Sequence, residues 1–255
     1  IHTMREYYDL WDDFHARLSP QGRIKEGVRR RLIHAADTYC FKHHVTKLFT
    51  ISGAVRDRVA KWNGVPAEVL HPPPPQRNYR CDGYGDFLFA PSRLSPLKRL
   101  DLVLQALAQP EASGIRCVIG GEGEEMDRLV RLSRTLGLDS RVTFTGRLDE
   151  PALVDHLARC RAVVFVPHDE DYGFVTVEAF ASAKPVVTCQ DSGGPLELVR
   201  DGSNGWVTAP TPADLARALA DAMAGGGTAE RRGQQGQRDI ASLTWANVVS
   251  RLVIV

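Results

Sequence analysis

From Asp86 onward, short apolar runs alternate with longer amphipathic segments, and this alternation limits the folds open to the chain. The apolar runs have strand length and cover 87–90, 115–119, 142–144, 162–166, 185–188 and 206–207. Segments with helical spacing of apolar residues lie at 97–107, 124–136, 150–160 and 212–223. Strands that alternate with helices predict βαβ units. The expected fold class is therefore α/β, a parallel sheet with helices on both faces.

The residues before this region predict a partial second α/β domain. A helix is expected over about 23–38, a strand over 45–51, and another helix after Ser52, a good N-cap. The four prolines at 72–75 cannot continue a helix or a central strand, so they predict a stiff connector. The domains expected are therefore 1–75 and 76–255.

Composition excludes several classes of protein. Hydrophobic residues make up 43% of the chain, and no apolar run approaches the ~18 residues of a membrane span. The five cysteines are widely spaced and odd in number, which argues against a disulfide framework or a zinc site and favours the cytoplasm. The chain starts with Ile1-His2-Thr3, which resembles the end of a strand, and we expect an N-terminal truncation.

The net charge of +1 conceals an asymmetry. Residues 1–64 contain 12 Lys and Arg against 7 Asp and Glu, and Arg29-Arg30-Arg31 is the most basic run. One interpretation is a surface that faces anionic lipid or an anionic acceptor. The favoured interpretation is an ordinary solvated helix, in which Ile24, Val28 and Leu32 form a core stripe. No nucleic-acid partner is expected.

Polar or glycine-rich clusters follow five of the predicted strands at their carboxyl ends. The clusters are Arg93 with Lys98, Gly120 to Gly123, Gly146-Arg147, His168 to Gly173, and Asp191 to Gly194. The carboxyl ends of parallel strands share one edge, where α/β sheets bind ligands. We therefore expect one crevice built from all five loops. The alternative is an α/β domain that binds no ligand, in which the five clusters would share one edge by accident.

The loop after the fourth of these strands contains two glutamates, Glu170 and Glu178, with seven residues between them. Glu170 is expected on the loop and Glu178 on the helix that follows it. Two carboxylates at this edge suit the hydroxyls of a sugar and of a ribose. The neighbours of Glu178 are apolar, and an unpaired buried carboxylate is costly, which favours a ligand or a partner for it.

Positive charge and glycines complete the expected site. Arg93 and Lys98 supply charge for a diphosphate. Gly121 and Gly123 allow backbone to approach a ligand closely, and a tight turn is the alternative. Met126 replaces the third glycine of a dinucleotide fingerprint.

Glycines in two further loops are expected to free backbone amides. Gly173 would turn the amides of Phe174 and Val175 toward phosphate, and Gly193-Gly194 would act similarly. Two other patterns, His168-x-Glu170 and His43-His44, lack a third metal ligand at sensible spacing, so no metal site is expected.

These motifs together resemble those of retaining glycosyltransferases of family 4, which have the GT-B architecture of two facing Rossmann-like domains. The matching segments are Ser92 to Leu94 with Lys98, and residues 120–123, 142–148, 170–187, 192–199 and 201–205. The resemblance covers roughly residues 86–225. It implies a hexosyltransferase that takes a UDP- or GDP-sugar as donor and a glycan or lipid-linked sugar as acceptor.

The resemblance also implies roles for individual residues. Arg93 and Lys98 would bind the donor diphosphate, Glu178 the ribose, and Glu170 with the backbone at 173–174 the donor sugar. Arg147 and Leu148 would face the base. No metal or other cofactor is implied, because positive side chains and a helix N-terminus replace it. A cytoplasmic enzyme is expected, and peripheral contact with the inner membrane face is left open.

His2 resembles a histidine that lines the sugar site in similar enzymes, and a terminal residue without a role is the alternative. Only about the last quarter of the first, acceptor-side domain is expected to be present. Two further functions remain open: a nucleotide-sugar epimerase on the same architecture, and a non-catalytic nucleotide-sugar binding module.

Overall fold

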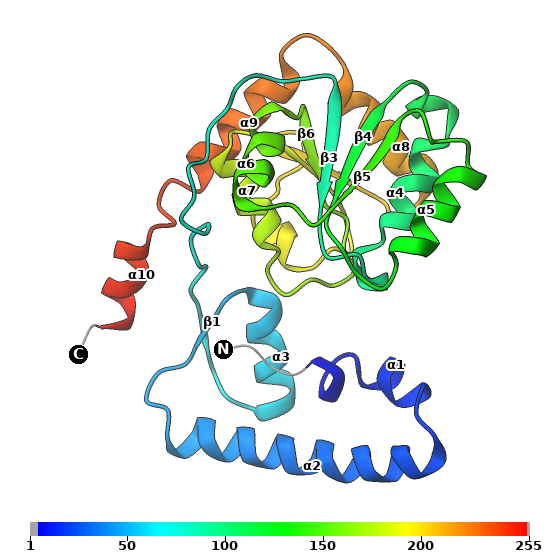
Figure 1. The fold of residues 1–255 in the computed structure, drawn as a ribbon. Helices are drawn as coiled ribbons and strands as arrows, with labels where there is room; N and C mark the ends of the chain where they lie inside the picture. Colours follow the sequence, from blue (N-terminus) through cyan, green and yellow to red (C-terminus); the bar gives the residue numbers. More distant parts are fainter. Residues whose placement is uncertain (1–4, 254–255) are drawn as a thin grey trace. The chain divides into compact units, whose positions relative to one another are not determined.

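The computed structural model describes residues 5–253 and divides the chain into two compact units that meet at Pro72 and Pro73 (Figure 1). The first unit contains η1 (Arg5–Tyr7), α1 (Trp11–Ala16), α2 (Pro20–His43), β1 (Phe49–Thr50), α3 (Gly53–Asn63) and β2 (Glu68–Val69). Its two short strands pair in parallel. The identity of this unit as part of an acceptor-side domain stays a prediction.

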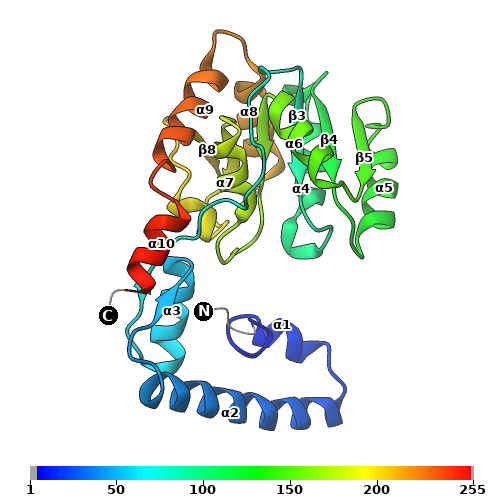
Figure 2. The same cartoon turned by 60° about the vertical axis from the view of Figure 1, so that its left-hand side comes forward.

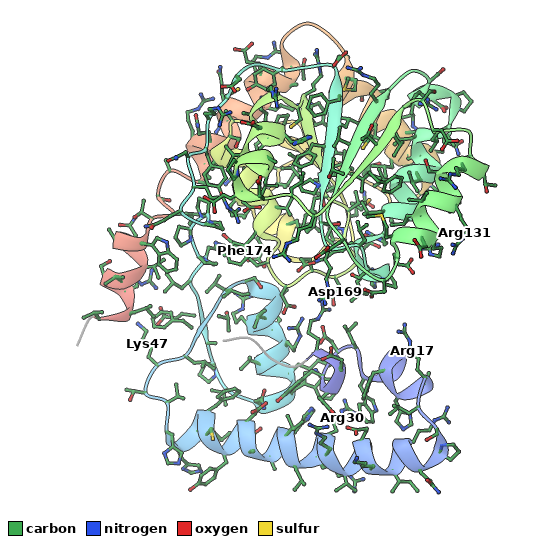
Figure 3. All side chains as sticks on the ribbon, viewed as in Figure 1. Arg17, Arg30, Lys47, Arg131, Asp169 and Phe174 are labelled. Atoms are coloured by element: carbon green, nitrogen blue, oxygen red, sulfur yellow. The ribbon has the colours of Figure 1, made fainter. Side chains whose placement is uncertain are left out.

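The long helix α2 packs through polar and aromatic side chains. Arg30, labelled in Figure 3, lies 4.7 Å from the ring of Trp11 and 5.0 Å from that of Trp62. Its Nε donates to the carbonyl of Tyr7, and His34 stacks on Tyr8 with ring centroids 4.3 Å apart. The face through which α2 packs is therefore the one that carries the half-buried Arg30 and His34.

The predicted core stripe of α2 is wrong. Ile24, Val28 and Leu32 are 74%, 54% and 66% exposed. They lie on a different face of the helix from Arg30 and His34, which make its contacts. The aliphatic core of the first unit gathers instead around Leu48, Val55 and Val59. The spacing of apolar residues identified an apolar face of α2 correctly, but α2 packs through another face.

The second unit is built on a six-stranded parallel sheet (Figures 1 and 2). Its strands are β3 (Phe87–Pro91), β4 (Arg116–Gly120), β5 (Val142–Gly146), β6 (Ala162–Val164), β7 (Val186–Cys189) and β8 (Gly205–Thr208). Its α-helices are α4 (Leu100–Leu107), α5 (Met126–Thr135), α6 (Glu150–Arg159), α7 (Phe174–Ala181), α8 (Pro212–Met223), α9 (Thr228–Asp239) and α10 (Trp245–Leu252). Short 3-10 helices are η2 (Pro96–Lys98), η3 (Pro110–Ala112) and η4 (Gly194–Glu197).

Helices cover both faces of this sheet, with α4, α5 and α8 on one face and α6, α7 and α9 on the other. Successive side chains of β3 pack on opposite faces of the sheet. Leu88 and Ala90 belong to the core beneath α4 and α8, whereas Phe89 stacks on His156 of α6 at 5.1 Å. A strand buried on both faces must be apolar throughout, which explains the continuous apolar runs. The expected α/β fold class is confirmed.

The connector from Pro73 to Asp86 contains no helix or strand, yet its second half is held against the second unit. The ammonium of Lys184, which is fully buried, donates to the carbonyl of Gly83 and lies 4.2 Å from the ring centre of Tyr84. The Tyr84 hydroxyl donates to the carbonyl of Ala183, and Arg80 pairs with Asp155. The connector therefore has a fixed path past the sheet.

Within residues 5–253, no helix is both long enough and apolar enough to cross a membrane.

Candidate functional site

The strand order β5-β4-β3-β6-β7-β8 places a change of direction between β3 and β6. Crossovers from β3 lead to β4 and β5 on one side, while β6, β7 and β8 continue on the other. The loops after β3 and β6 diverge at such a point and leave a crevice at the carboxyl ends of the strands. Asp169 and Phe174, labelled in Figure 3, belong to the segment that follows β6.

A pocket of about 410 Å³ opens at this edge. It is lined by Arg77, Pro91, Ser92, Arg93, Gly120, Gly121, Glu122, Arg147, Leu148, Leu153, Val175 and Glu178. Leu148, Leu153 and Val175 are apolar, whereas three arginines and two glutamates, Glu122 and Glu178, supply charge. The pocket thus combines apolar surface with convergent charged groups, as small-molecule sites commonly do.

Glu178 is the buried carboxylate of this pocket and is 7% exposed. It lies on α7, and its Oε1 accepts hydrogen bonds from Nη1 of Arg77 and, at 3.3 Å, from the hydroxyl of Tyr79. Burial raises the pKa of Glu178 above the usual value of a glutamate, and the guanidinium of Arg77 opposes that rise. The carboxylate is therefore paired within the protein.

Arg77 and Tyr79 were missed by the sequence analysis. They lie in the connector, where no motif marks them. Arg77 also lies 3.4 Å from Oε2 of Glu150, measured from its Nε. The one available signal was the buried carboxylate itself, since a glutamate in apolar surroundings needs a cationic or hydrogen-bonding partner.

Two other arginines offer charge to the pocket. Arg93 is exposed and has no ion pair or hydrogen bond with its side chain among the described residues. Arg147 is 81% exposed and lies 3.7 Å from Glu122. Exposed ion pairs of this kind are weak, so both guanidinium groups can serve an anionic ligand.

Lys98 and Glu170 pair with each other across the change of direction in the sheet. Lys98 ends η2 in the loop after β3, while Glu170 lies in the loop after β6. The ammonium of Lys98 also lies 5.5 Å from the ring centre of Phe165. The structure therefore brings these two predicted residues together, outside the lining of the pocket.

Glycines at this edge let neighbouring loops touch. A Cβ on Gly121 would lie 1.9 Å from the carbonyl oxygen of Ser92, and one on Gly123 would lie 2.2 Å from that of Leu94. Both contacts are with backbone, so neither position accepts a side chain. These glycines therefore let two loops of the protein touch, and their close approach to a ligand stays a prediction.

The loops after β6 and β7 are joined in the same way. Glu170 and Gly193 form a parallel bridge, and the amide of Gly194 donates to the carbonyl of Glu170 at 2.7 Å. A Cβ on Gly194 would lie 2.4 Å from the carbonyl oxygen of Asp171. Gly173, with a φ of 78°, caps the N-terminus of α7. These glycines set the position of Glu170.

Arg99 ties three loops together. Its guanidinium donates to both carboxylate oxygens of Asp191 at 2.7 Å and to the carbonyls of Val166 and Pro167 at 2.8 Å. His168 lies 3.4 Å from the same carboxylate. Burial alone would raise the pKa of Asp191, but the Arg99 hydrogen bonds outweigh it and lower that pKa below its usual value.

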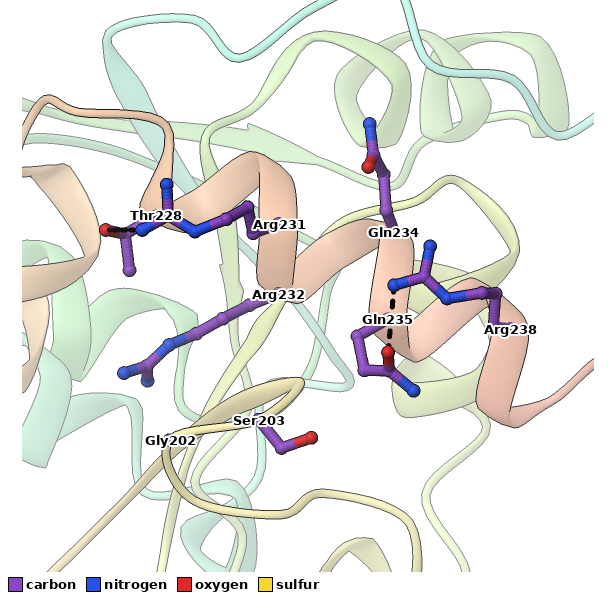
Figure 4. A pocket seen from close by; sticks show the side chains of 8 residues that line it. All are labelled: Gly202, Ser203, Thr228, Arg231, Arg232, Gln234, Gln235 and Arg238. Atoms are coloured by element: carbon purple, nitrogen blue, oxygen red, sulfur yellow. Dashed lines mark hydrogen bonds between the residues drawn. The ribbon is translucent and has the colours of Figure 1, made fainter.

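A second cavity of about 410 Å³ lies between α9 and the turn before β8 (Figure 4). Three arginines line it, and each has partners within the protein. Arg231 donates to Thr228, Arg238 to Gln235, and Arg232 to the carbonyl of Gly205. The turn before β8 lies at the amino end of that strand, at the opposite edge from the crevice.

The predicted site residues divide into two groups. Arg93, Gly121, Arg147, Leu148, Val175 and Glu178 line the first pocket. Lys98, Gly123, Glu170, Gly173, Phe174, Gly193 and Gly194 belong to the surrounding loops and are not among its lining residues. His2 lies outside the described residues. Between Arg5 and Val253 no group of three His, Cys, Asp or Glu side chains could hold a metal ion.

Comparison with known proteins points to one family. The family model for "Glycosyl transferases group 1" matches residues 80–239. A D-inositol 3-phosphate glycosyltransferase of Frankia alni is 30% identical over 207 residues, which are 76% of this chain and 49% of that protein. An exopolysaccharide phosphotransferase of Streptomyces coelicolor is 33% identical over 143 residues, 54% of this chain and 15% of that protein. The chain thus spans half or less of these curated relatives.

A solved structure has the same fold. Anabaena Alr3699/HepE, in complex with UDP and glucose, superposes with a TM-score of 0.75 at 21% identity. The match covers 87% of this chain and 65% of that one. Together with the parallel sheet, this likeness places the chain among proteins of the GT-B fold.

Replacing Asp191 by asparagine tests the Arg99 network. Since the pKa of Asp191 is lowered in the folded state, its contribution to stability is present above the unfolded pKa and is lost as the pH falls through the folded pKa. We expect Asp191→Asn to lower the free energy of unfolding by about 1 kcal/mol at pH 7. The difference from the unmutated chain should shrink below about pH 4.

Urea unfolding followed by circular dichroism at several pH values measures this effect. Asp139→Asn is the matched control, because Asp139 is exposed and has no partner among the described residues. An equal effect of both substitutions, or an effect of Asp191→Asn that does not depend on pH, would contradict the proposed charge pairing.

Proposed function

Because the chain belongs to the family of group 1 glycosyl transferases, we propose that it moves a hexosyl group from a nucleotide-diphosphate sugar to a glycan or lipid-linked sugar. We propose further that, as in family 4, the reaction retains the anomeric configuration and needs no metal ion. The observation that carries this proposal is the pocket in which Arg93, Glu178 and an apolar wall meet at the carboxyl edge of the sheet.

Each part of a nucleotide sugar has a matching surface in this proposal. The base lies against the wall of Leu148 and Leu153, beside Arg147, and the ribose hydroxyls donate to Glu178. The diphosphate binds to the guanidinium of Arg93 and to the first backbone amides of α7. The UDP and glucose bound by the Anabaena protein support UDP over GDP as the nucleotide.

The proposed step forms one bond and breaks another at the anomeric carbon. The acceptor hydroxyl oxygen attacks that carbon, and the bond from the carbon to the diphosphate oxygen breaks. The hydroxyl proton passes to the leaving phosphate. Arg93 and Lys98 stabilise the negative charge that develops on the diphosphate, while Glu170 orients the donor sugar. The Lys98–Glu170 pair supports these roles because it holds both side chains at the crevice.

Nucleotide binding tests the first part of the proposal. Titration of UDP and GDP into the purified chain by calorimetry should show binding of one of them. Glu178→Gln keeps the shape of the side chain but loses the charge-assisted hydrogen bonds to ribose. These are worth about 2–3 kcal/mol, so the Kd should rise about 30- to 150-fold.

Glu124→Gln is the matched control, since Glu124 is exposed, lies in the loop after β4 and does not line the pocket. Binding of neither nucleotide by the chain, or equal binding by Glu178→Gln, would overturn the assignment of the pocket.

Stereochemistry and metal dependence are tested on the product. With UDP-glucose and an acceptor sugar, the full-length enzyme should form a product whose anomeric proton shows the configuration of the donor by NMR. Turnover should persist in excess EDTA and should be lost in Lys98→Ala. An inverted product or a requirement for divalent metal would refute this part. Donor epimerisation without transfer would instead identify an epimerase, and binding without consumption a binding module.

A cytoplasmic enzyme with a peripheral membrane contact is the proposed setting for a lipid-linked acceptor. Ile24, Val28 and Leu32 form an exposed apolar stripe on α2, and Lys25 and Arg29 lie beside it in the sequence. An apolar face with basic residues beside it favours the surface of anionic lipid.

The chain should therefore co-sediment with vesicles that contain phosphatidylglycerol but not with phosphatidylcholine vesicles. Leu32→Asp should reduce that co-sedimentation severalfold, because it places a negative charge on the apolar stripe. Leu252→Asp, which changes an exposed leucine of α10, is the control. Equal sedimentation with both kinds of vesicle would argue against the contact.

A further inference from the structure

We propose that Arg77 and Tyr79 of the connector are positioning residues that hold one oxygen of Glu178 so that the other oxygen is presented to the donor ribose. This inference rests on the proposed function, in which Glu178 binds the ribose. It assigns a role to two residues that no motif of the chain contains.

The first support is the distribution of contacts over the carboxylate. Arg77 and Tyr79 both donate to Oε1 of Glu178, and among the described residues no hydrogen bond to Oε2 is formed. Glu178 also lines the pocket. One oxygen is therefore occupied by the protein, and the other remains able to accept hydrogen bonds from a ligand.

The second support is that Arg77 is itself held in place. Its Nε lies 3.4 Å from Oε2 of Glu150 on α6, and its Nη1 lies 3.4 Å from the hydroxyl of Tyr79. The side chain of Arg77 is only 22% exposed. A guanidinium held between two carboxylates has few alternative positions, so it fixes the Glu178 side chain rather than following it.

The third support is the state of Tyr79. Burial and the adjacent charge of Glu178 raise the pKa of Tyr79 above its usual value, so its hydroxyl keeps its proton and donates. Burial also raises the pKa of Glu178, whereas the Arg77 guanidinium lowers it. Arg77 thus favours the ionised form of the buried carboxylate, which can accept from two hydroxyls.

The competing interpretation of the same contacts is that Arg77 blocks Glu178 and so competes with the ribose for its carboxylate. If Arg77 had to leave Glu178 before ribose could bind, removing Arg77 would tighten nucleotide binding. If Arg77 positions the carboxylate, removing it weakens binding. The two interpretations therefore predict changes of opposite sign in one measurement.

The test is a titration of UDP, or of GDP if the chain binds that nucleotide instead, into the complete chain and its variants. Arg77→Gln should raise the Kd about tenfold, and Tyr79→Phe about threefold. Arg77→Lys should restore part of the affinity, because it returns the charge but not the planar fork. Arg80→Gln is the matched control, since Arg80 lies in the same connector and pairs with Asp82 and Asp155 on the exposed surface.

The pH dependence of binding distinguishes positioning from general support of the fold. Affinity should fall as the pH drops through the pKa of Glu178, and in Arg77→Gln this fall should begin at higher pH. Other charged groups at the pocket are Arg93, Glu122, Arg147 and, through Arg77, Glu150. They are unchanged in the variant, and the same nucleotide is used throughout, so the shift reports on Arg77.

The outcomes separate the two proposals. Failure of the unmutated chain to bind either nucleotide overturns the proposed function and this inference with it. Binding by the unmutated chain that is equal or tighter in Arg77→Gln overturns the inference alone. A lower thermal midpoint in Arg77→Gln with unchanged affinity and an unchanged pH profile would make Arg77 a purely structural residue. Tyr79→Phe, which removes one hydroxyl, gives the answer if Arg77→Gln does not fold.

Discussion

The pairing of β3 with both β4 and β6 is the constraint on which the site depends. The crossover after β3 leads to β4 on one side, and the crossover after β6 leads to β7 on the other, so the loops after β3 and β6 diverge. Arg93 and Lys98 come from one loop and Glu170 from the other. A different strand order would leave the same residues in the chain but would not bring them to one crevice.

At this edge of the sheet, three carboxylates each have a cationic partner within the protein. Glu178 has Arg77, Glu170 has Lys98, and Asp191 has Arg99. Each pair joins segments that are far apart in the sequence, so the pairs set geometry as well as charge. Arg93 differs from these residues because its guanidinium has no partner among those described. It is the positive group most available to an incoming anion.

Much of the second unit could be predicted from the sequence, because its strands and helices depend on local runs and on the spacing of apolar residues. The run at 115–119 predicted β4, and the segment at 212–223 predicted the bounds of α8. The glycine and charged clusters also lie at one edge of the sheet as predicted, since the carboxyl ends of parallel strands share an edge. Arg77 could not be predicted as a partner of Glu178, because 100 residues lie between them and an extended connector carries no periodic signal.

In the first unit, by contrast, the spacing of apolar residues did not predict how a helix packs. The apolar spacing of α2 is genuine, yet the helix packs through the face with Arg30 and His34. Periodicity identifies a face but not its surroundings, which depend on what the neighbouring segments offer. Here Trp11, Trp62 and Tyr8 offer aromatic rings, and a guanidinium and an imidazole pack well against them.

The bridge between Glu170 and Gly193 continues the pairing of parallel chains beyond the ends of β6 and β7. Two loops registered in this way cannot change length independently. An insertion in one would shift Glu170 along its neighbour and bring a side chain where only Gly194 fits against Asp171. Diversification of such a protein toward new substrates would then be confined to loops without this register, while these two could change only together.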